Sequence, residues 1–224
     1  PHHPELTGRS VLTARPDIED LERRFGLSQD DILDRIEEIQ ERLFYARQER
    51  VPPGLDDKVL TDWNGLALAA FAEAARVLEE PAYAMAAGRL AEFLRASVWR
   101  DGVLYHTWKA GEARVPGMLE DYTYLGLGLV ELYKTTGELA WLDWARELWE
   151  ATLARFRDPE TGTFFDTASD AEQLIVRQRS FFDAATPSGN GAAALLGLWL
   201  GRYYGPAEWE RVVDDVVAAV AGPL

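Results

Sequence analysis

Apolar residues recur at helical spacing along most of the chain, and they group into three successive pairs of predicted helices. In each pair a nearly all-apolar helix comes first, at residues 61–79, 118–136 and 188–204. A one-sided helix follows, at residues 81–97, 139–156 and 206–221. A helix that is apolar all round must be covered by other elements, whereas an amphipathic helix can face water. The pattern therefore predicts an all-α fold of helical hairpins with an inner and an outer layer.

Residues 1–54 differ from this pattern and are predicted to form a lead-in segment with one or two helices. Helical spacing runs over residues 18–25 and again from 28 to about 47, where the opposite face is charged. The run Val51-Pro52-Pro53-Gly54 then breaks the chain sharply. We expect the hairpin repeats to occupy residues 55–224.

Short β straps are expected between the hairpins. An Asp-Gly turn at residues 101–102 leads into alternating residues, and residues 158–165 repeat a turn followed by aromatic residues. Glycines inside the apolar helices, such as Gly126 and Gly128, permit close approach of neighbouring backbones. Repetition of this kind predicts a partial ring, an (α/α)6-toroid-like array. A solenoid is less favoured, because solenoid repeats are usually shorter and more uniform.

Each predicted inner helix begins with a tight polar cluster: Asp62-Trp63-Asn64, Glu120-Asp121-Tyr122 and Ser188-Gly189-Asn190. If the inner helices run parallel, these starts meet at one mouth, where unpaired backbone N–H groups add positive potential. Helix capping alone is an equal alternative for Asp62 and for Ser188. Two adjacent acids exceed the needs of a single cap, although about 100° of rotation separates neighbouring helix positions, so only one is expected to face the mouth.

Carboxylates, amides and aromatic rings are therefore the candidate chemistry of this mouth. Asp57, Glu120 and Asp121 are the predicted acid/base residues, because glycoside chemistry requires a pair of carboxylates. Aromatic faces can stack on a sugar while polar groups bind its hydroxyls. The predicted ligand-binding residues are Lys58, Asp62, Trp63, Asn64, His106, Tyr122, Arg177, Arg179, Ser188 and Asn190. The alternatives are ordinary core packing for the aromatic rings, a scaffold hydrogen bond for His106 and a salt-bridged loop for the two arginines.

Composition excludes several classes of function. A net charge of -15 and a pI near 4.6 oppose binding to nucleic acid or to anionic lipid surfaces. The chain has no cysteine, which removes disulfides, thiolate metal sites and thiol nucleophiles. His106 is the one histidine beyond the first three residues, so we predict no histidine-cluster metal site and no cofactor. No apolar run reaches the length of a membrane span, and a cytoplasmic setting is expected.

The strings Asp56 to Gly65, Leu119 to Tyr122 and Pro187 to Asn190 resemble the helical portion of the thioredoxin-domain-containing YyaL / spermatogenesis-associated protein family. The segment from His2 to Thr13 is also similar to that family. The resemblance implies a toroid like those of six-hairpin glycosidases and sugar epimerases, preceded by a thioredoxin-like domain that this chain is expected to lack.

The resemblance leaves two functions open. The first is a carbohydrate-active or carbohydrate-binding domain, with hydrolase-like use of acids favoured over epimerisation because epimerase relatives rely on histidines. The second is a non-catalytic scaffold or regulatory domain that works with a thioredoxin-like domain. The expected partners are accordingly a sugar-derived small molecule and that domain.

Overall fold

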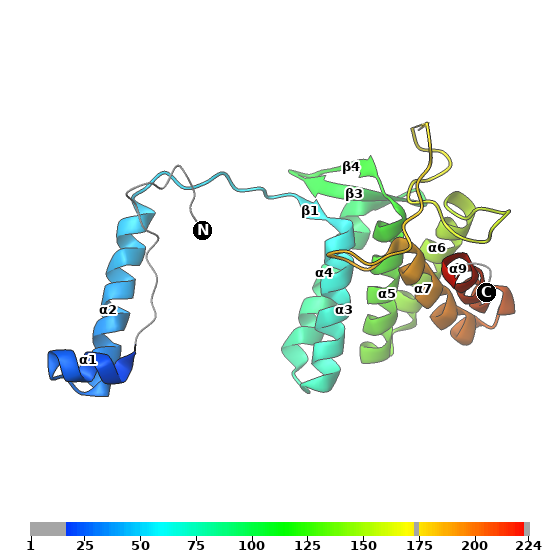
Figure 1. Cartoon of the computed structure of the whole chain (residues 1–224). Helices are drawn as coiled ribbons and strands as arrows, with labels where there is room; N and C mark the ends of the chain where they lie inside the picture. Colours follow the sequence, from blue (N-terminus) through cyan, green and yellow to red (C-terminus); the bar gives the residue numbers. More distant parts are fainter. Residues whose placement is uncertain (1–16, 173–174, 222–224) are drawn as a thin grey trace. The chain divides into compact units, whose positions relative to one another are not determined.

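The computed structural model describes residues 17–172 and 175–221, so the predictions for residues 1–16, including the segment from His2 to Thr13, lie outside the described residues. The chain divides into two compact units, Pro1–Asp56 and Asp57–Leu224. Each unit is described by itself (Figure 1).

The first unit contains two helices whose ends follow local sequence signals. Helix α1 (Ile18–Phe25) starts at the Asp17 cap and ends at Gly26, which takes a left-handed φ of 65°. Helix α2 (Gln29–Gln48) starts at the Ser28 cap. Among the described residues of these two helices, Ile32 alone is buried. Their apolar side chains are therefore mostly exposed.

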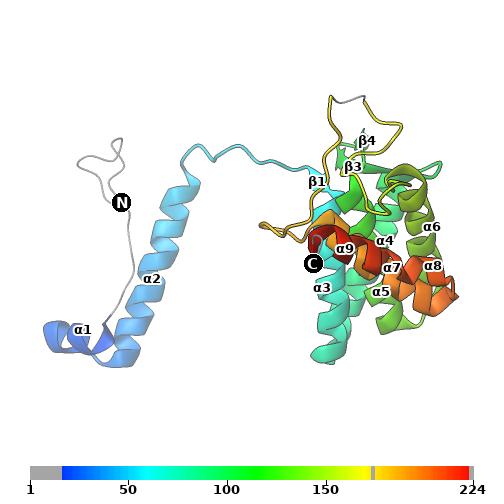
Figure 2. The ribbon, with the colours of Figure 1, turned by 45° about the vertical axis from the view of Figure 1, so that its right-hand side comes forward.

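The second unit is built from successive helical hairpins, and the predicted pairs are present. Their helices are α3 (Thr61–Val77) and α4 (Pro81–Val98), α5 (Leu119–Thr136) and α6 (Leu139–Arg155), and α7 (Gly189–Tyr204) with α8 (Ala207–Glu210) and α9 (Val212–Ala221). The last outer helix is split, whereas one helix over residues 206–221 was predicted. Helix α5 lies between α3 and α7 in both views (Figures 1 and 2).

The inner helices α3 and α5 differ in how much of their surface is buried, although the sequence predicts both to be covered. Helix α5 is the most buried, since its neighbours α3, α6 and α7 cover it on several sides. Helix α3 was predicted to be buried on most sides, but Phe71, Val77 and Trp63 are exposed. The physical reason is that α3 packs on α5 and α4 and presents a further side to solvent.

Glycines bring α3 and α5 into backbone contact. A Cβ atom at Gly65 would lie 2.5 Å from the Leu125 backbone nitrogen, and one at Gly128 would lie 2.7 Å from the Gly65 carbonyl oxygen. Real Cβ atoms do not approach so closely, so only glycine fits at either position. The predicted role of glycines in the inner helices is thereby confirmed at this crossing.

The first strap is a small antiparallel sheet at the end of the unit where α3 and α5 begin (Figure 1). Its strands are β1 (Val59–Leu60), β2 (Trp99–Arg100), β3 (Val103–Lys109) and β4 (Glu112–Pro116). Strand β3 pairs with the other three, with Thr107 opposite both Leu60 and Arg114. The strap thus ties the chain before α3 to the chain before α5.

The second strap is less regular. Its turn over residues 158–162 is closed by an isolated bridge between Arg157 and Phe164. Phe164 is fully buried against Trp149 of α6, with ring centroids 5.8 Å apart. The described residues between Phe165 and Ser188 form no helix or strand, and α7 begins at Gly189.

Candidate active site at the inner helix starts

The first turns of α3, α5 and α7 lie at one end of the inner layer, which confirms the predicted convergence. The Asp62 backbone N–H, in the first turn of α3, donates to Asp121 Oδ1 of α5 at 3.0 Å. The Tyr124 hydroxyl of α5 donates to the Pro187 carbonyl, two residues before α7. We define the start cluster as the four titratable residues Asp62, His106, Glu120 and Asp121.

Asp121 is the buried centre of the start cluster, with a side chain only 1% exposed. Its Oδ2 accepts the Met118 backbone N–H at 2.8 Å, which caps α5. His106 Nδ1 lies 2.9 Å from Oδ1 and 3.1 Å from Oδ2. Together with the Asp62 N–H, donors from three elements meet on one carboxylate. Asp121 therefore positions the starts of α3 and α5 relative to strand β3.

His106 lies among the carboxylates of the start cluster, and these favour its protonated form. The hydrogen bond to Asp121 raises the pKa of His106 above its ordinary value of 6.5, and the charges of Asp62 and Glu120 add to this effect against the opposing effect of burial. The imidazole consequently keeps its proton to a higher pH than a free histidine does. The predicted scaffold hydrogen bond of His106 is present.

Asp62 and Glu120 are the half-buried acids of the start cluster. Burial raises the pKa of Asp62, and the neighbouring Asp121 charge raises it further. Burial likewise raises the pKa of Glu120, with added repulsion from Asp166, Asp121 and Asp62. Within the described part of the chain, no hydrogen bond or ion pair is made to the Glu120 carboxylate. A carboxyl group in such surroundings is suited to donate a proton.

Helix α7 contributes structural contacts rather than open polar groups. Ser188 Oγ accepts the Gly191 backbone N–H at 3.1 Å and so caps the helix. Asn190 is fully buried: its Oδ1 accepts the Phe164 N–H, and its Nδ2 donates to the carbonyls of Phe164 and Ser180. The interpretation of Asn190 as a hydroxyl partner of a ligand is corrected, because every polar atom of its side chain is occupied by the second strap.

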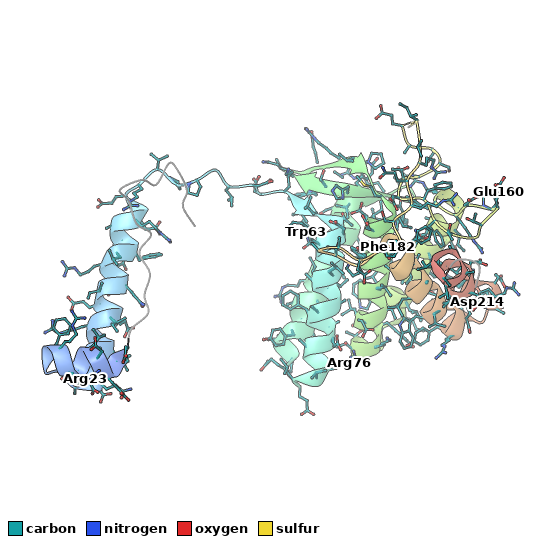
Figure 3. The ribbon with its side chains drawn as sticks, in the orientation of Figure 1. Arg23, Trp63, Arg76, Glu160, Phe182 and Asp214 are labelled. Carbon is teal, nitrogen blue, oxygen red and sulfur yellow. The ribbon has the colours of Figure 1, made fainter. Side chains whose placement is uncertain are left out.

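Of the two aromatic residues predicted to bind a ligand, Tyr122 is buried and Trp63 is exposed. Tyr122 is fully buried, its ring centroid lies 5.2 Å from that of Phe156, and its hydroxyl accepts the Leu104 N–H at 2.9 Å. Its predicted stacking role is therefore wrong, because Tyr122 points into the core one helix position after Asp121. Trp63 is 61% exposed and stands at the first turn of α3 (Figure 3).

Three predicted residues near α3 have partners outside the start cluster. Asp57 Oδ1 lies 2.5 Å from Lys109 Nζ, and this hydrogen bond lowers the pKa of Asp57. Asn64 Nδ2 donates to the Leu60 carbonyl at 2.7 Å. Lys58 is exposed just before β1. The structure thus gives Asp57 a cation partner and gives Asn64 a local capping contact.

Arg177 and Arg179 hold the segment before α7. Their guanidinium carbons lie 4.0 and 4.1 Å from the centroid of the Phe165 ring. Arg179 pairs with Asp158, and Arg177 donates to the Thr167 carbonyl. The Arg179 pair corresponds to the salt-bridged loop that was the alternative prediction for both arginines. Arg177 holds the same segment through a backbone carbonyl and the Phe165 ring.

Two residues near the start cluster escaped sequence analysis. Asp166 raises the pKa of Glu120, while its own oxygens accept the Ser180 N–H and hydroxyl at 2.9 and 2.8 Å. Phe182 is 82% exposed and lies on the segment before α7, at the same end of the inner helices as Trp63 (Figure 3). The sequence feature that could have indicated them is their position between the second strap and the third predicted inner helix.

Asp62, His106 and Asp121 also form the described group that could hold a metal ion. One ligand atom from each lies within 4.8 Å of the others. Carboxylate oxygen and imidazole nitrogen suit several divalent ions. Both Asp121 oxygens already accept hydrogen bonds, however, so an ion would have to displace the His106 contact. The prediction of no metal stays a prediction.

The arrangement of helices is shared with carbohydrate-active proteins of known structure. A family 76 α-mannanase of Bacteroides thetaiotaomicron superposes with a TM-score of 0.61 at 16% identity, covering 76% of this chain and 45% of the mannanase. A cellobiose 2-epimerase from Spirochaeta thermophila gives 0.59 at 15% identity, with coverages of 71% and 42%. The fold is thus the helical toroid of six-hairpin glycosidases and sugar epimerases, of which this chain holds a partial ring.

The sequence is similar to a particular family within that fold class. Human spermatogenesis-associated protein 20 is 34% identical over 218 residues, which cover 92% of this chain and 28% of the human protein. The mouse protein is 33% identical over the same length. These matches confirm the resemblance to the spermatogenesis-associated protein family. The chain spans about a quarter of the length of these relatives, and no family model matches it.

The length and apolar character of the helices bear on whether they could cross a membrane. Over residues 17–172 and 175–221, no helix has both the length and the apolar character that crossing a membrane requires.

Proposed function

We propose that the second unit is a carbohydrate-active, glycoside-hydrolase-like domain whose reacting groups belong to the start cluster. The observation that carries this proposal is the pair of half-buried carboxyl groups with raised pKa values, Asp62 and Glu120, at the common end of the inner helices. Exposed Trp63 and Phe182 flank this end, where flat rings can stack on a sugar.

The residues take different roles in this proposal. Glu120 is the proton donor, because burial and like charges favour its protonated form. Asp62 is the second carboxylate. Asp121 and His106 position the two helix starts through their shared hydrogen bonds. Asp57 receives no proton-donor role, because Lys109 favours its ionised form.

A solved structure with the same fold supports carboxyl groups as the reacting groups. A family 76 α-1,6-mannanase of Salegentibacter sp. is described as inactive when two consecutive aspartates are replaced, and its structure holds α-1,6-mannotriose. That protein superposes with a TM-score of 0.59 at 16% identity, covering 92% of this chain and 58% of the mannanase. This chain also has consecutive acids at the start of an inner helix, Glu120 and Asp121. In our proposal Glu120 is the proton donor and Asp121 positions the helix starts. We therefore take a neutral sugar chain as the first substrate class to test.

A second function, a scaffold that acts beside a thioredoxin-like domain, is favoured by how many carboxylates already have partners. Asp121 accepts backbone donors, Asp57 pairs with Lys109, and Asp158 pairs with Arg179. Acids that are satisfied in this way stabilise a fold without taking part in a reaction. In this alternative the start cluster holds the inner helices together. A cytoplasmic setting is compatible with both functions and is tested by cell fractionation.

The deciding experiment compares the chain with its Glu120→Gln variant on α- and β-linked manno- and gluco-oligosaccharides, with released sugars measured by chromatography. Hydrolysis should fall by about 10²- to 10⁴-fold, the usual contribution of a general acid. Glu150→Gln, an exposed acid on outer helix α6, is the matched control and should keep full activity.

Stability separates the two functions independently of the choice of substrate. Glu120→Gln should leave the melting temperature at pH 7 unchanged or higher, because a neutral amide avoids the burial and like-charge repulsion that disfavour the Glu120 carboxylate. No hydrolysis and no melting shift with any sugar, together with a destabilised Glu120→Gln variant, would support the scaffold function instead.

A further inference from the structure

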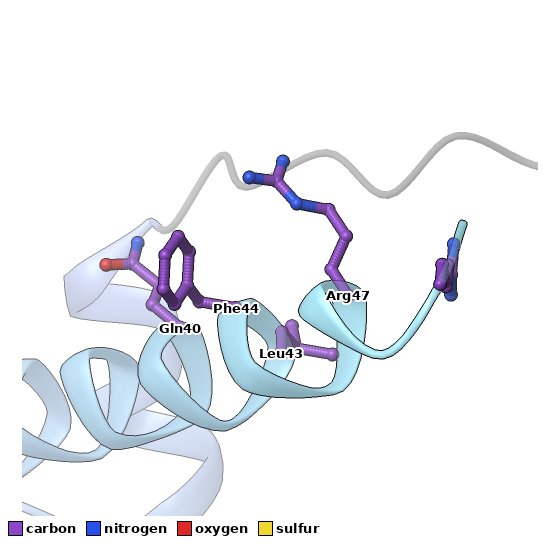
Figure 4. A pocket seen from close by; sticks show the side chains of 5 residues that line it. Gln40, Leu43, Phe44 and Arg47 are labelled. Carbon is purple, nitrogen blue, oxygen red and sulfur yellow. The ribbon is translucent and has the colours of Figure 1, made fainter. Parts of the chain in front are cut away.

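Asp166, directly after the second strap, is an acid outside the start cluster that acts on Glu120. Its position matters because a charged neighbour sets how readily a proton donor keeps its proton. The groove on α2 offers no comparable group, since the described residues of its lining are Gln40, Leu43, Phe44, Arg47 and Arg50 (Figure 4). The acidic surroundings of Glu120 are therefore a property of the second unit.

Backbone contacts place Asp166 at the start of α5. The Leu119 N–H is one of the first-turn donors that a helix cannot satisfy by itself. It donates to the Asp166 carbonyl at 3.0 Å, and Leu119 directly precedes Glu120. The Asp166 N–H in turn donates to the Gln178 carbonyl at 2.9 Å. The backbone of Asp166 is therefore held between α5 and the segment that leads to α7.

The Asp166 side chain is held by groups that belong to the α7 side of the fold. Ser180 donates its backbone N–H at 2.9 Å to one carboxylate oxygen and its hydroxyl at 2.8 Å to the other. The Ser180 carbonyl accepts Nδ2 of Asn190, a fully buried residue of α7, at 3.1 Å. The carboxylate thus cannot turn away from this position without losing two hydrogen bonds.

Charged groups from several elements act on Glu120. Burial is the largest cause of its raised pKa, and repulsion from Asp166 comes next, ahead of repulsion from Asp121 of α5 and Asp62 of α3. His106 of β3 acts in the opposite direction and lowers this pKa. Among the described residues, the acid with the strongest effect on Glu120 therefore comes from outside the start cluster.

Helix α7 packs against Glu120 through a glycine and brings no charged side chain at that point. A Cβ atom at Gly189 would lie 3.4 Å from Glu120 Cγ. The acid just before this helix, Asp183, accepts the Ser188 N–H at 2.8 Å through Oδ1. The positive end of α7 favours an ionised carboxylate nearby. The acids around Glu120 must therefore act against both this helix end and His106.

We propose that Asp166 is a positioning residue whose fixed negative charge keeps Glu120 protonated and so maintains it as a proton donor. The proposal rests on the proposed function, which gives Glu120 that role. A negative charge held beside a carboxyl group makes the loss of its proton less favourable. Asp166 itself gives and takes no proton in this role. Its hydrogen bonds to Ser180 keep the charge in place.

The test measures the pKa of Glu120 directly in the whole chain. Carbon-13 NMR follows the carboxyl carbon of Glu120, whose signal is identified by its loss in Glu120→Gln. Asp166→Asn removes the charge but keeps the shape, because the amide oxygen still accepts the Ser180 N–H and the hydroxyl can accept from the amide. The pKa of Glu120 should fall in this variant, and circular dichroism confirms that the variant is folded.

Two further variants separate charge from packing. Asp166→Glu keeps the charge, so the pKa of Glu120 should stay raised. Asp170→Asn makes the same substitution four residues along, where the carboxylate pairs with Arg155, and should leave the pKa of Glu120 unchanged. An unchanged pKa in Asp166→Asn would overturn the proposal. An equal fall in Asp166→Glu or in Asp170→Asn would also overturn it, because the charge of Asp166 would then not be the cause.

The pH dependence of hydrolysis adds a readout that a purely structural role would not change. A general acid loses activity as the pH rises through its pKa. The alkaline limb of the profile should therefore move to lower pH in Asp166→Asn, whereas a structural defect would lower activity at every pH. If the parent chain hydrolyses no sugar while Asp166→Asn lowers the pKa of Glu120, the proposed function fails and the effect of Asp166 on Glu120 is confirmed.

Discussion

Replacing Gly65 with alanine tests the backbone contact on which the start cluster depends. A Cβ atom at position 65 would lie 2.5 Å from the Leu125 nitrogen and 2.7 Å from the Tyr124 carbonyl carbon, both in the backbone of α5. Neither atom can move away by changing a rotamer, so α3 and α5 must separate. Separation would also lengthen the hydrogen bond from the Asp62 N–H to Asp121, which lies one turn away.

Two opposing effects set the size of the change. Alanine favours a helix over glycine by about 1 kcal/mol in a helix interior. Overpacking a core costs about 1–3 kcal/mol, and a clash with backbone on both sides belongs at the upper end of that range. The steric cost therefore exceeds the gain, and we expect Gly65→Ala to lower the free energy of unfolding by about 2 kcal/mol.

Gly88→Ala is the matched control, because Gly88 lies inside α4 and no atom is within 4 Å of its added Cβ. This variant should gain about 0.5–1 kcal/mol from helix propensity alone. Urea unfolding followed by tryptophan fluorescence measures both variants. All eight tryptophans lie at or after Trp63, so the signal reports the second unit by itself.

The comparison has a clear refuting outcome. If Gly65→Ala unfolds at the same or a higher urea concentration than the parent chain, with the same dependence on urea, α3 and α5 do not approach as described. Gly88→Ala controls for effects of the substitution other than the backbone clash. If this variant also lost stability, the assay would be reporting something other than packing at the crossing of α3 and α5.

Two further predictions concern the groups around the start cluster. Asn190→Ala should lower the free energy of unfolding by about 2–4 kcal/mol, because it leaves the buried N–H and carbonyl of Phe164 without partners. Asn64→Ala, which removes one partly exposed contact, is the milder control in the same urea assay. The raised pKa of His106 stabilises the fold below its ordinary value of 6.5 and loses that effect as pH rises through the raised value. The difference in unfolding free energy between the parent chain and His106→Asn should therefore shrink from pH 6 to 9, and a constant difference would contradict the assigned contact with Asp121.

Much of the architecture was accessible from sequence because its determinants are local. Helical spacing of apolar residues placed every inner helix within a few residues, and the caps at Ser28 and Ser188 and the left-handed Gly26 marked helix ends. The convergence of three polar helix starts also followed from the sequence, because parallel inner helices bring their N-termini to one end. Apolar content did not predict that α5 is more buried than α3, because burial depends on the neighbours that pack against each helix.

The chemistry of the individual side chains was decided by the tertiary structure. Glu120, Asp121 and Tyr122 are consecutive, yet their surroundings differ. The Glu120 carboxyl is half-buried and has no hydrogen-bonding partner among the described residues, Asp121 accepts three donors, and Tyr122 lies in the core. The rotation of about 100° per helix residue predicts that these three side chains point in different directions. It does not predict which of them faces the start cluster. The partners that decide it, Asp62 and His106, come from elements 59 and 15 residues away from Asp121. A carboxylate's role depends on such distant donors and on its burial, and these are properties of the packed chain rather than of its local sequence.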